Sequence, residues 1–125
     1  MKKEVMFHCG NAPKMERVID LTIALADKDA KAAKSHVRED FVWNEVGKGE
    51  IAKYENLGDV LSNRPEVSKI QVTNGLSHGN GAMCEGELQF ADNTVLFFCS
   101  VVQFVNTAKD ALVKELHIYF IRETA

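Results

Sequence analysis

The sequence lacks the features that mark several classes of protein. No stretch approaches the roughly 18 consecutive apolar residues that a membrane-spanning helix needs, so we expect no membrane partner. The 15 basic residues are dispersed along a chain of net charge −3, without the basic stripe that binds nucleic acid, so we expect no nucleic-acid partner either. The apolar run in the opening MKKEVMF ends at His8, which is too short for a signal peptide.

Cysteine and histidine are also scarce. Cys9, Cys84 and Cys99 are an odd number of cysteines at unrelated spacings, which predicts reduced thiols in a cytoplasmic protein rather than a disulfide framework. The four histidines form neither an H-x-H nor an H-x-x-H pair, and none stands beside a C-x-x-C motif. Because metal sites require specific sets of ligands, we expect no metal site, and we expect no cofactor.

What the chain does contain is a change of hydrophobic period along its length. With 125 residues and 46% hydrophobic residues, it is expected to form one domain over residues 1–125 without disulfides or metal. Helical spacing predicts helices from Pro13 to about residue 28, over residues 30–37 and over residues 50–63. Alternation predicts strands at residues 41–46, 68–76, 82–90, 94–105 and 111–122, with a turn at residues 47–49. This order predicts an α+β fold with the helices on one face of a curved antiparallel sheet.

The strand predicted at residues 94–105 is apolar on both of its faces. One alternating set is Val95, Phe97, Cys99 and Val101, and the other is Leu96, Phe98, Val102 and Phe104. An antiparallel sheet covered by helices on one face is normally polar on the other. We therefore expect a second subunit to cover the outer face, giving a homodimer. The alternative is a tightly closed barrel whose two faces are both buried by its own chain.

Several segments together resemble a known superfamily. They are EDFVWNEVGKGEI at residues 39–51, Ser77-His78-Gly79, FFCSVVQF at residues 97–104 and KELHIYFIRE at residues 114–123. With the order of elements, they resemble the nuclear transport factor 2-like superfamily, in particular its SnoaL-like and ketosteroid-isomerase-like proteins, from about Pro13 to Glu123. The resemblance implies a cone-shaped α+β barrel of the cystatin-like type, in which three helices close one side of the curved sheet and leave a pocket at its open end. It also implies dimers through the outer sheet face.

Glu45 is the candidate catalytic residue. The resemblance places it where ketosteroid isomerases carry the aspartate that acts as general base, with glutamate here in place of aspartate. Side chains two apart on a strand share a face, so Glu45 points the same way as Trp43. A carboxylate in such apolar surroundings should have a raised pKa, which suits a general acid or base. The alternative is a half-exposed residue at a strand end that accepts a hydrogen bond from the neighbouring backbone.

The positions around Glu45 argue against steroid isomerisation. The resemblance places Leu21 and Val101 where the isomerases carry their two oxyanion donors, and neither side chain can donate a hydrogen bond. Gln103 is the candidate donor that orients a ligand, or else a polar group at the pocket mouth that water satisfies. The pocket wall is expected to consist of Trp43, Leu88, Cys99, Val101, Leu116, Ile118 and Phe120, with His117 and Tyr119 on the outer face.

These observations predict a protein that binds a small apolar organic ligand in an apolar pocket. If it is an enzyme, it is a cofactor-independent isomerase, dehydratase or cyclase in which Glu45 is the general base. Proteins of this superfamily have several such activities as well as plain binding functions, so the fold alone does not decide between an enzyme and a binding protein. The alternative is a non-catalytic ligand-binding or dimeric interaction module.

Overall fold

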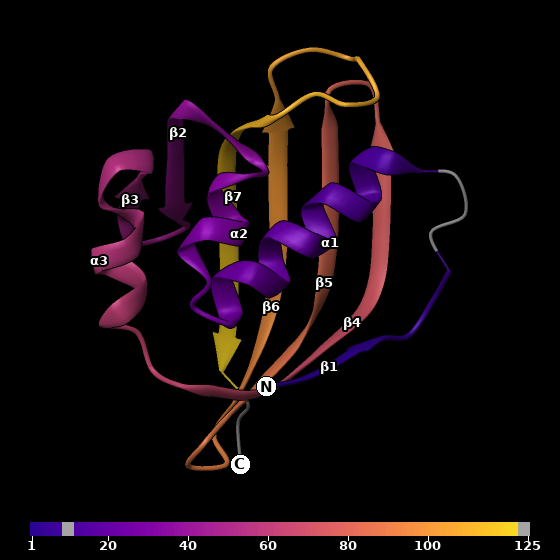
Figure 1. Cartoon of the computed structure of the whole chain (residues 1–125). Helices are drawn as coiled ribbons and strands as arrows, with labels where there is room; N and C mark the ends of the chain where they lie inside the picture. Colours follow the sequence, from indigo (N-terminus) through magenta and orange to yellow (C-terminus); the bar gives the residue numbers. More distant parts are fainter. Residues whose placement is uncertain (9–11, 123–125) are drawn as a thin grey trace.

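Seven strands and a small set of helices make up the described part of the chain, residues 1–8 and 12–122 of a computed structural model (Figure 1). Cys9 and Glu123, which the sequence interpretation used, lie outside these residues. The helices are α1 (Pro13–Ala26), α2 (Ala30–Lys34), the 3₁₀-helix η1 (Tyr54–Asn56) and α3 (Leu57–Ser62). The strands are β1 (Lys2–Val5), β2 (Val37–Glu45), β3 (Gly49–Lys53), β4 (Val67–His78), β5 (Gly81–Phe90), β6 (Val95–Phe104) and β7 (Val113–Arg122).

The strands form one curved sheet in the order β1-β4-β5-β6-β7-β2-β3. The pairs β1–β4 and β2–β7 are parallel, and the other neighbouring pairs are antiparallel. The helices lie on one face of this sheet, with α1 crossing β4, β5 and β6 (Figure 1). The predicted α+β fold is therefore confirmed. Because β1 and β3 end the sheet without pairing with each other, the closed-barrel alternative is wrong for the described residues.

Helix α1 presents an apolar face to the concave side of the sheet. Pro13 stands in its first turn, where a missing backbone N–H costs nothing, and Glu16 lies near the positive end of the helix dipole. Val18, Leu21 and Leu25 are buried on the sheet side. Fully burying a side chain of this size contributes about 1.5–3 kcal/mol, so the face that packs on β4, β5 and β6 holds α1 in place.

The predicted helix over residues 50–63 is partly wrong, because its first residues form strand β3. Gly47 and Gly49 have φ of 93° and 103°, a conformation that glycine adopts without steric cost, and they reverse the chain into a hairpin. The reversal lays β3 beside β2, with Ala52 opposite Trp43. Pairing with β2 therefore outweighs the helical spacing of Ile51, and helical structure begins only at Tyr54.

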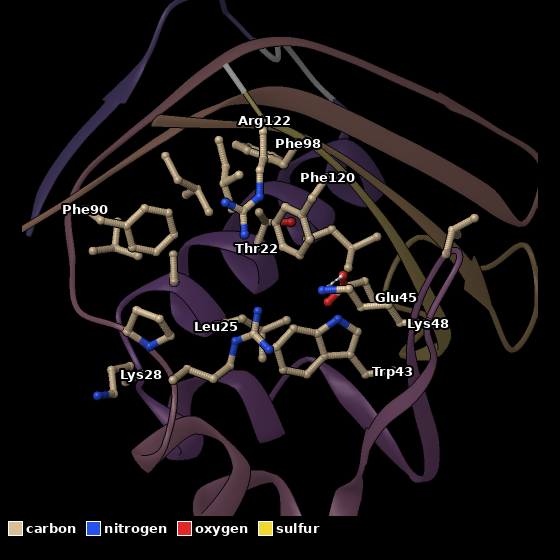
Figure 2. A pocket seen from close by; sticks show the side chains of 18 of the residues that line it. Thr22, Leu25, Lys28, Trp43, Glu45, Lys48, Phe90, Phe98, Phe120 and Arg122 are labelled. Carbon is tan, nitrogen blue, oxygen red and sulfur yellow. Dashed lines mark ion pairs between the residues drawn. The ribbon is translucent and has the colours of Figure 1, made fainter. Parts of the chain in front are cut away.

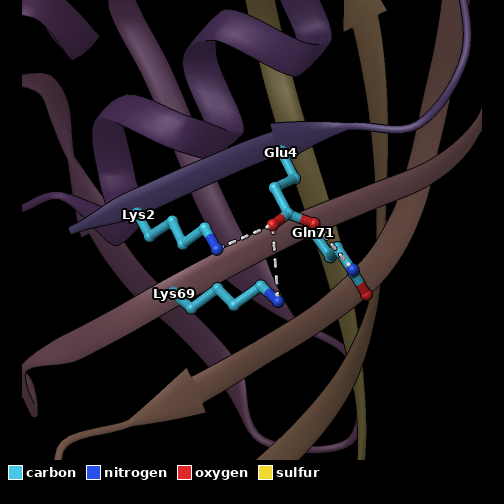
Figure 3. A network of polar contacts seen from close by, with 4 residues as sticks. All are labelled: Lys2, Glu4, Lys69 and Gln71. Atoms are coloured by element: carbon cyan, nitrogen blue, oxygen red, sulfur yellow. Dashed lines mark hydrogen bonds and ion pairs between the residues drawn. The ribbon is translucent and has the colours of Figure 1, made fainter.

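Strand β1 is absent from the sequence-based prediction. It pairs in parallel with the edge of β4, where the Glu4 carboxylate meets Lys2 Nζ at 3.2 Å and Lys69 Nζ at 3.5 Å (Figure 3). Gln71 Nε2 donates to the same carboxylate at 2.9 Å. The hydrogen bonds from Gln71 and Lys2 lower the pKa of Glu4. These polar contacts join β1 to β4, while its lysines discourage a further strand from adding to this edge.

His36, in the turn just before β2, makes the stability of the fold dependent on pH. Arg17 Nη1 donates to His36 Nδ1 at 3.1 Å, which requires a neutral ring at that nitrogen. Burial, and then the charge of Arg17, lower the pKa of His36 below its ordinary 6.5, although Asp20 opposes this. The folded protein therefore binds this proton less readily than the unfolded chain, so stability is lost as pH falls from above 6.5 through the folded pKa.

We expect the urea concentration at the unfolding midpoint to decrease as the pH is lowered from about 7.5 to about 5.5. The decrease should be smaller in a His36→Gln variant. This window lies above the ordinary values of 4.5 for Glu4 and 3.8 for Asp92, whose pKa values are lowered and whose contributions are lost only at more acidic pH. His78→Gln, at the exposed end of β4, is the control and should follow the wild type. If the midpoint depended on pH equally in the wild type and in His36→Gln, the pH dependence could not be assigned to His36.

Candidate functional site

A cavity of about 480 Å³ lies between the concave face of the sheet and helix α1 (Figure 2). This volume falls within the range of about 300–1,000 Å³ typical of small-molecule sites. The wall comes from α1 and the turn after it, the end of β2 and the β2–β3 turn, the α3–β4 connection and the start of β4, and the ends of β5, β6 and β7. The lining residues are Thr22, Leu25, Ala26, Lys28, Trp43, Glu45, Val46, Gly47, Lys48, Arg64, Pro65, Val67, Leu88, Phe90, Leu96, Phe98, Ile118, Phe120 and Arg122.

Strand β2 brings Trp43 and Glu45 to the same side of this cavity. In the parallel pairing with β7, Trp43 stands opposite Leu116 and Glu45 opposite Ile118, so both side chains face inward. The Glu45 side chain is 13% exposed, and its Oε2 lies 3.3 Å from Lys48 Nζ. The hairpin turn holds this rim in place, because the Lys48 N–H donates to the Glu45 carbonyl at 3.0 Å. Glu45 is thus a mostly buried carboxylate that still reaches the cavity.

Trp43 brings an unused hydrogen-bond donor to the same wall. The residue is 2% exposed, and its indole Nε1 has no hydrogen-bond partner among the described residues. In Figure 2 the indole nitrogen lies on the edge of the ring turned toward Glu45 and the cavity. Leaving a buried N–H unpaired costs roughly 1–3 kcal/mol, so a ligand acceptor in the cavity would remove a real penalty.

Arg64 covers the face of the Trp43 ring. Its guanidinium carbon lies 5.1 Å from the ring centroid, a cation–π distance. Burial lowers the pKa of Arg64, and the charge of Glu45 acts in the opposite direction. An arginine does not lose its proton in ordinary conditions, so the site contains a partly desolvated positive charge.

Five of the sequence-predicted residues meet at this cavity. The structure places Trp43, Glu45, Leu88, Ile118 and Phe120 in its lining. They come from β2, β5 and β7, and they converge because each occupies an inward position of its strand. Their positions agree with the expected pocket wall, while their roles as ligand contacts or as a base stay predictions.

Four other placements require correction. Cys99, Val101 and Gln103 lie on the outer face of β6. The inward positions of that strand belong to Phe98, which pairs with Phe120, and to the residues two apart from it. Gln103 is exposed and does not reach the cavity, so it cannot orient a ligand there. Leu116 does face inward, but it is fully buried in the core and does not line the cavity.

A pair of buried hydroxyl groups lies where α1 meets β6. Thr22 Oγ1 is 2.8 Å from the Val18 carbonyl oxygen and 3.0 Å from Ser100 Oγ. Thr22 is 4% exposed and Ser100 is fully buried. When Thr22 donates to Val18, Ser100 donates to Thr22, so the hydroxyl groups satisfy each other. They add a small polar element to a mostly apolar cavity that Thr22 lines.

Sequence reasoning missed two phenylalanines and the arginines of the wall. Phe90 and Phe98 line the cavity because they belong to the alternating sets of β5 and β6 that face inward. Both strands are apolar, so alternation alone did not reveal which set that is. Arg122 faces inward because it lies two residues after the inward Phe120 on β7. Arg64, in the connection after α3, had no sequence signal that pointed to the cavity.

The outer face of the sheet is apolar along β6 and β7. Phe97 is 41% exposed, Tyr119 46% and Ile121 68%, and they line a groove of about 470 Å³ together with Cys99. Burial and the charge of Glu85 raise the pKa of the Cys99 thiol, which does not favour a reactive thiolate. His117 and Tyr119 lie on this face as expected, with His117 Nε2 3.2 Å from Glu115 Oε2.

Two further classes of feature are absent from the described residues. No three or more histidine, cysteine, aspartate or glutamate side chains among residues 1–8 and 12–122 come together as a metal-binding group. Within the same residues, none of the helices combines the length and apolar character needed to cross a membrane.

Comparison with solved structures identifies the fold as nuclear transport factor 2-like. A nuclear transport factor 2-like protein of unknown function from Burkholderia xenovorans is 19% identical, with a TM-score of 0.74, over 90% of this chain and 86% of the other. A putative ketosteroid isomerase from Kribbella flavida is 14% identical, with a TM-score of 0.73, over 90% and 81%. A putative SnoaL-like polyketide cyclase from Shewanella denitrificans is 10% identical, with a TM-score of 0.66, over 85% and 88%.

These similarities bear on the fold and not on the activity, because each identity is low. No protein-family model matches the chain, and no curated protein matches it in sequence. The structural neighbours agree with a cone-shaped α+β arrangement and with the resemblance seen in the sequence.

Proposed function

We propose that the protein binds a small organic molecule in the cavity and catalyses proton transfer on it, with Glu45 as the general base. The observation that carries this proposal is Glu45 itself, a carboxylate 13% exposed in the lining of a mostly apolar cavity. The buried, unpartnered Nε1–H of Trp43 in the same wall supports it. Proton transfer of this kind needs no cofactor.

The proposed step requires a ligand with an acidic C–H next to a carbonyl group. Glu45 takes the proton, the C–H electron pair forms a carbon–carbon double bond, and the carbonyl π electrons move onto its oxygen. The Trp43 Nε1–H donates a hydrogen bond to that oxygen, the role of an oxyanion donor. When the ligand also carries a carbon–carbon double bond between its β and γ carbons, return of the proton to the γ carbon re-forms the carbonyl and gives the conjugated isomer. Delivery of the proton to a departing β-hydroxyl group gives an unsaturated carbonyl compound and water.

Two structural neighbours support chemistry at carbon in this fold. One is a putative ketosteroid isomerase and another a putative SnoaL-like polyketide cyclase. The Trp43 donor is of interest because Leu21, at the position of the isomerases' first oxyanion donor, is buried in the core and cannot donate. We therefore assign the chain to isomerisation or dehydration of a ligand other than a steroid enone.

The proposal is tested by hydrogen exchange at carbon. The wild-type protein is incubated with 2-tetralone, an apolar ketone with acidic α-hydrogens, in D₂O, and exchange is followed by proton NMR. Exchange faster than in protein-free buffer, saturable in ketone, supports the proposal. Saturable binding of the ketone with no acceleration would favour the alternative, a non-catalytic ligand-binding module.

The cytoplasmic location indicated by the cysteine pattern is part of the same proposal.

Association of two copies through the outer sheet face is a second part of the proposal. The helices cover only the concave face, which leaves Phe97, Tyr119 and Ile121 exposed on the other. A contiguous apolar surface of this kind on a soluble chain is typical of an interface. The antiparallel strands β6 and β7 present the same side chains on each copy, as a two-fold contact requires.

We expect sedimentation equilibrium to find a dimer, and Ile121→Glu to raise its dissociation constant about 10-fold or more, because a charge would be buried at the contact. Val5→Glu is the matched control, since Val5 is also exposed, at 43%, but lies on the edge strand β1. A monomeric wild type, or an Ile121→Glu variant that dimerises as the wild type does, would contradict this part of the proposal.

A further inference from the structure

The cavity lining carries more positive charge than negative, in contrast to the whole chain. Lys28, Lys48, Arg64 and Arg122 line it, against the single carboxylate of Glu45, while the chain has a net charge of −3. Basic side chains are therefore concentrated where a ligand would lie. An apolar ligand without charge gives no reason for such a concentration.

The two lysines form ion pairs, whereas the two arginines form none among the described residues. Lys28 Nζ lies 3.0 Å from Glu66 Oε1, and Lys48 Nζ lies 3.3 Å from Glu45 Oε2. Among the described residues, no ion pair is formed by Arg64 or Arg122. The pairing of Lys48 with Glu45 also leaves the guanidinium groups as the positive charges open to a ligand.

The positions of the two arginines allow both to reach one ligand. Arg64 stacks on Trp43, 5.1 Å from the ring centroid, and is partly desolvated there. Arg122 occupies an inward position near the end of β7, and Figure 2 shows its side chain extending from the strand end toward the middle of the cavity. Phe90, Phe98 and Phe120 lie around it as apolar surface.

We infer that the ligand is an apolar organic acid whose carboxylate binds to Arg64 and Arg122. Arg64 is partly buried and forms no ion pair among the described residues, so a bound anion would offset the cost of its desolvation. The planar guanidinium matches a carboxylate through two parallel hydrogen bonds, which an ammonium cannot make. The hydrocarbon body of the acid then packs on the three phenylalanines. This inference rests on the proposed ligand binding and names the class of ligand.

The test compares carboxylic acids with their neutral amides. Benzoate, 2-naphthoate, cinnamate and cyclohexanecarboxylate are each titrated beside the corresponding amide by isothermal calorimetry. Trp43, the only tryptophan of the chain, lines the cavity and gives a second, fluorescence readout of its occupancy. We expect at least one acid to bind about 10-fold or more tightly than its amide, the size expected for charge-assisted hydrogen bonds.

Two single variants and a matched control separate the arginines from general charge effects. Arg64→Gln and Arg122→Gln should each reduce the preference for acid over amide several-fold, and the double variant should bring the ratio close to one. Arg122 is exposed at a strand end, so its variant tests the inference even if Arg64→Gln unfolds. Arg38→Gln removes the same charge from the surface of β2, where Arg38 pairs with Asp40, and should keep the wild-type preference.

The outcomes distinguish this inference from the proposal on which it rests. Equal binding of acids and amides overturns the inference and leaves ligand binding in place. A preference for acids that survives the double variant also overturns it, because the charge would then act from elsewhere. If none of the acids and none of the amides binds, both the proposed ligand binding and the inference are overturned.

Discussion

Replacement of Glu45 by glutamine is expected to lower the catalysed exchange of 2-tetralone α-hydrogens by about 10²–10⁴-fold, the usual contribution of a general base. Glutamine has nearly the same size and still reaches the cavity, but its amide does not accept a proton from carbon. Binding of the neutral ketone should change little, since the apolar wall is untouched. The measurement is proton NMR in D₂O for the rate and calorimetry for the dissociation constant.

A matched substitution on the same strand separates this effect from loss of charge. Glu39→Gln removes a carboxylate from an exposed position of β2 and should keep the wild-type exchange rate. Trp43→Phe removes the Nε1–H and keeps an aromatic ring, and should lower the rate less than Glu45→Gln does. Exchange that continues at the wild-type rate in Glu45→Gln would show that this carboxylate is not the base.

Replacement of Gly86 by alanine is expected to destabilise the fold by about 3 kcal/mol or more, in the upper range for overpacked sites. A Cβ at this position would lie 1.8 Å from the Gln71 carbonyl oxygen, 2.8 Å from its carbon and 3.0 Å from Val72 Cα. All three atoms are backbone, so no side chain can rotate away. Urea denaturation should show a lower midpoint, or a chain that does not fold.

The reason for this close approach is a bulge between β4 and β5. Val72 pairs with Gly86 and Asn74 with Glu85, which leaves Thr73 as an extra residue on β4. A bulge bends its strand and increases the local twist. In this protein the bend contributes to the curvature that makes one face of the sheet concave. If Gly86→Ala folds at all, we therefore also expect weaker ligand binding in the cavity.

Gly81 provides the control in the same strand. Its added Cβ would lie 3.8 Å from the nearest atoms, the carbonyl oxygens of His78 and Val102, which is ordinary contact. Gly81→Ala should change the free energy of unfolding by no more than about 1 kcal/mol, and can stabilise the fold by restricting the unfolded chain. Equal stability of Gly86→Ala and Gly81→Ala would contradict the tight approach of β4 to β5.

The candidate base could be placed from the sequence because its geometry is local. In an extended strand, side chains two apart share a face whatever surrounds them, so Trp43 and Glu45 had to point the same way. The family resemblance then indicated that this face is inward, as the register with β7 has it. Helix α1 was equally accessible, since proline at its start and apolar residues at helical spacing determine it locally.

Strand β6 shows why other site residues could not be placed. Both of its alternating sets are apolar, so its sequence is compatible with either phase, and a shift by one residue exchanges every side chain between the faces. Pairing of Leu96 with Leu88 and of Phe98 with Phe120 decided the phase. Cys99, Val101 and Gln103 therefore lie outside.

The sequence by itself determined the α+β class, the pair Trp43 and Glu45, and the excess of apolar surface on the sheet. Tertiary structure alone decided the phase of β6, the hairpin that replaced the start of the third predicted helix, and the meeting of Arg64 with Arg122 at one cavity. The physical reason is the distance along the chain over which each interaction acts. Periodicity and turn propensity act between neighbouring residues, whereas strand pairing and the desolvation of a charge depend on groups that only folding brings together.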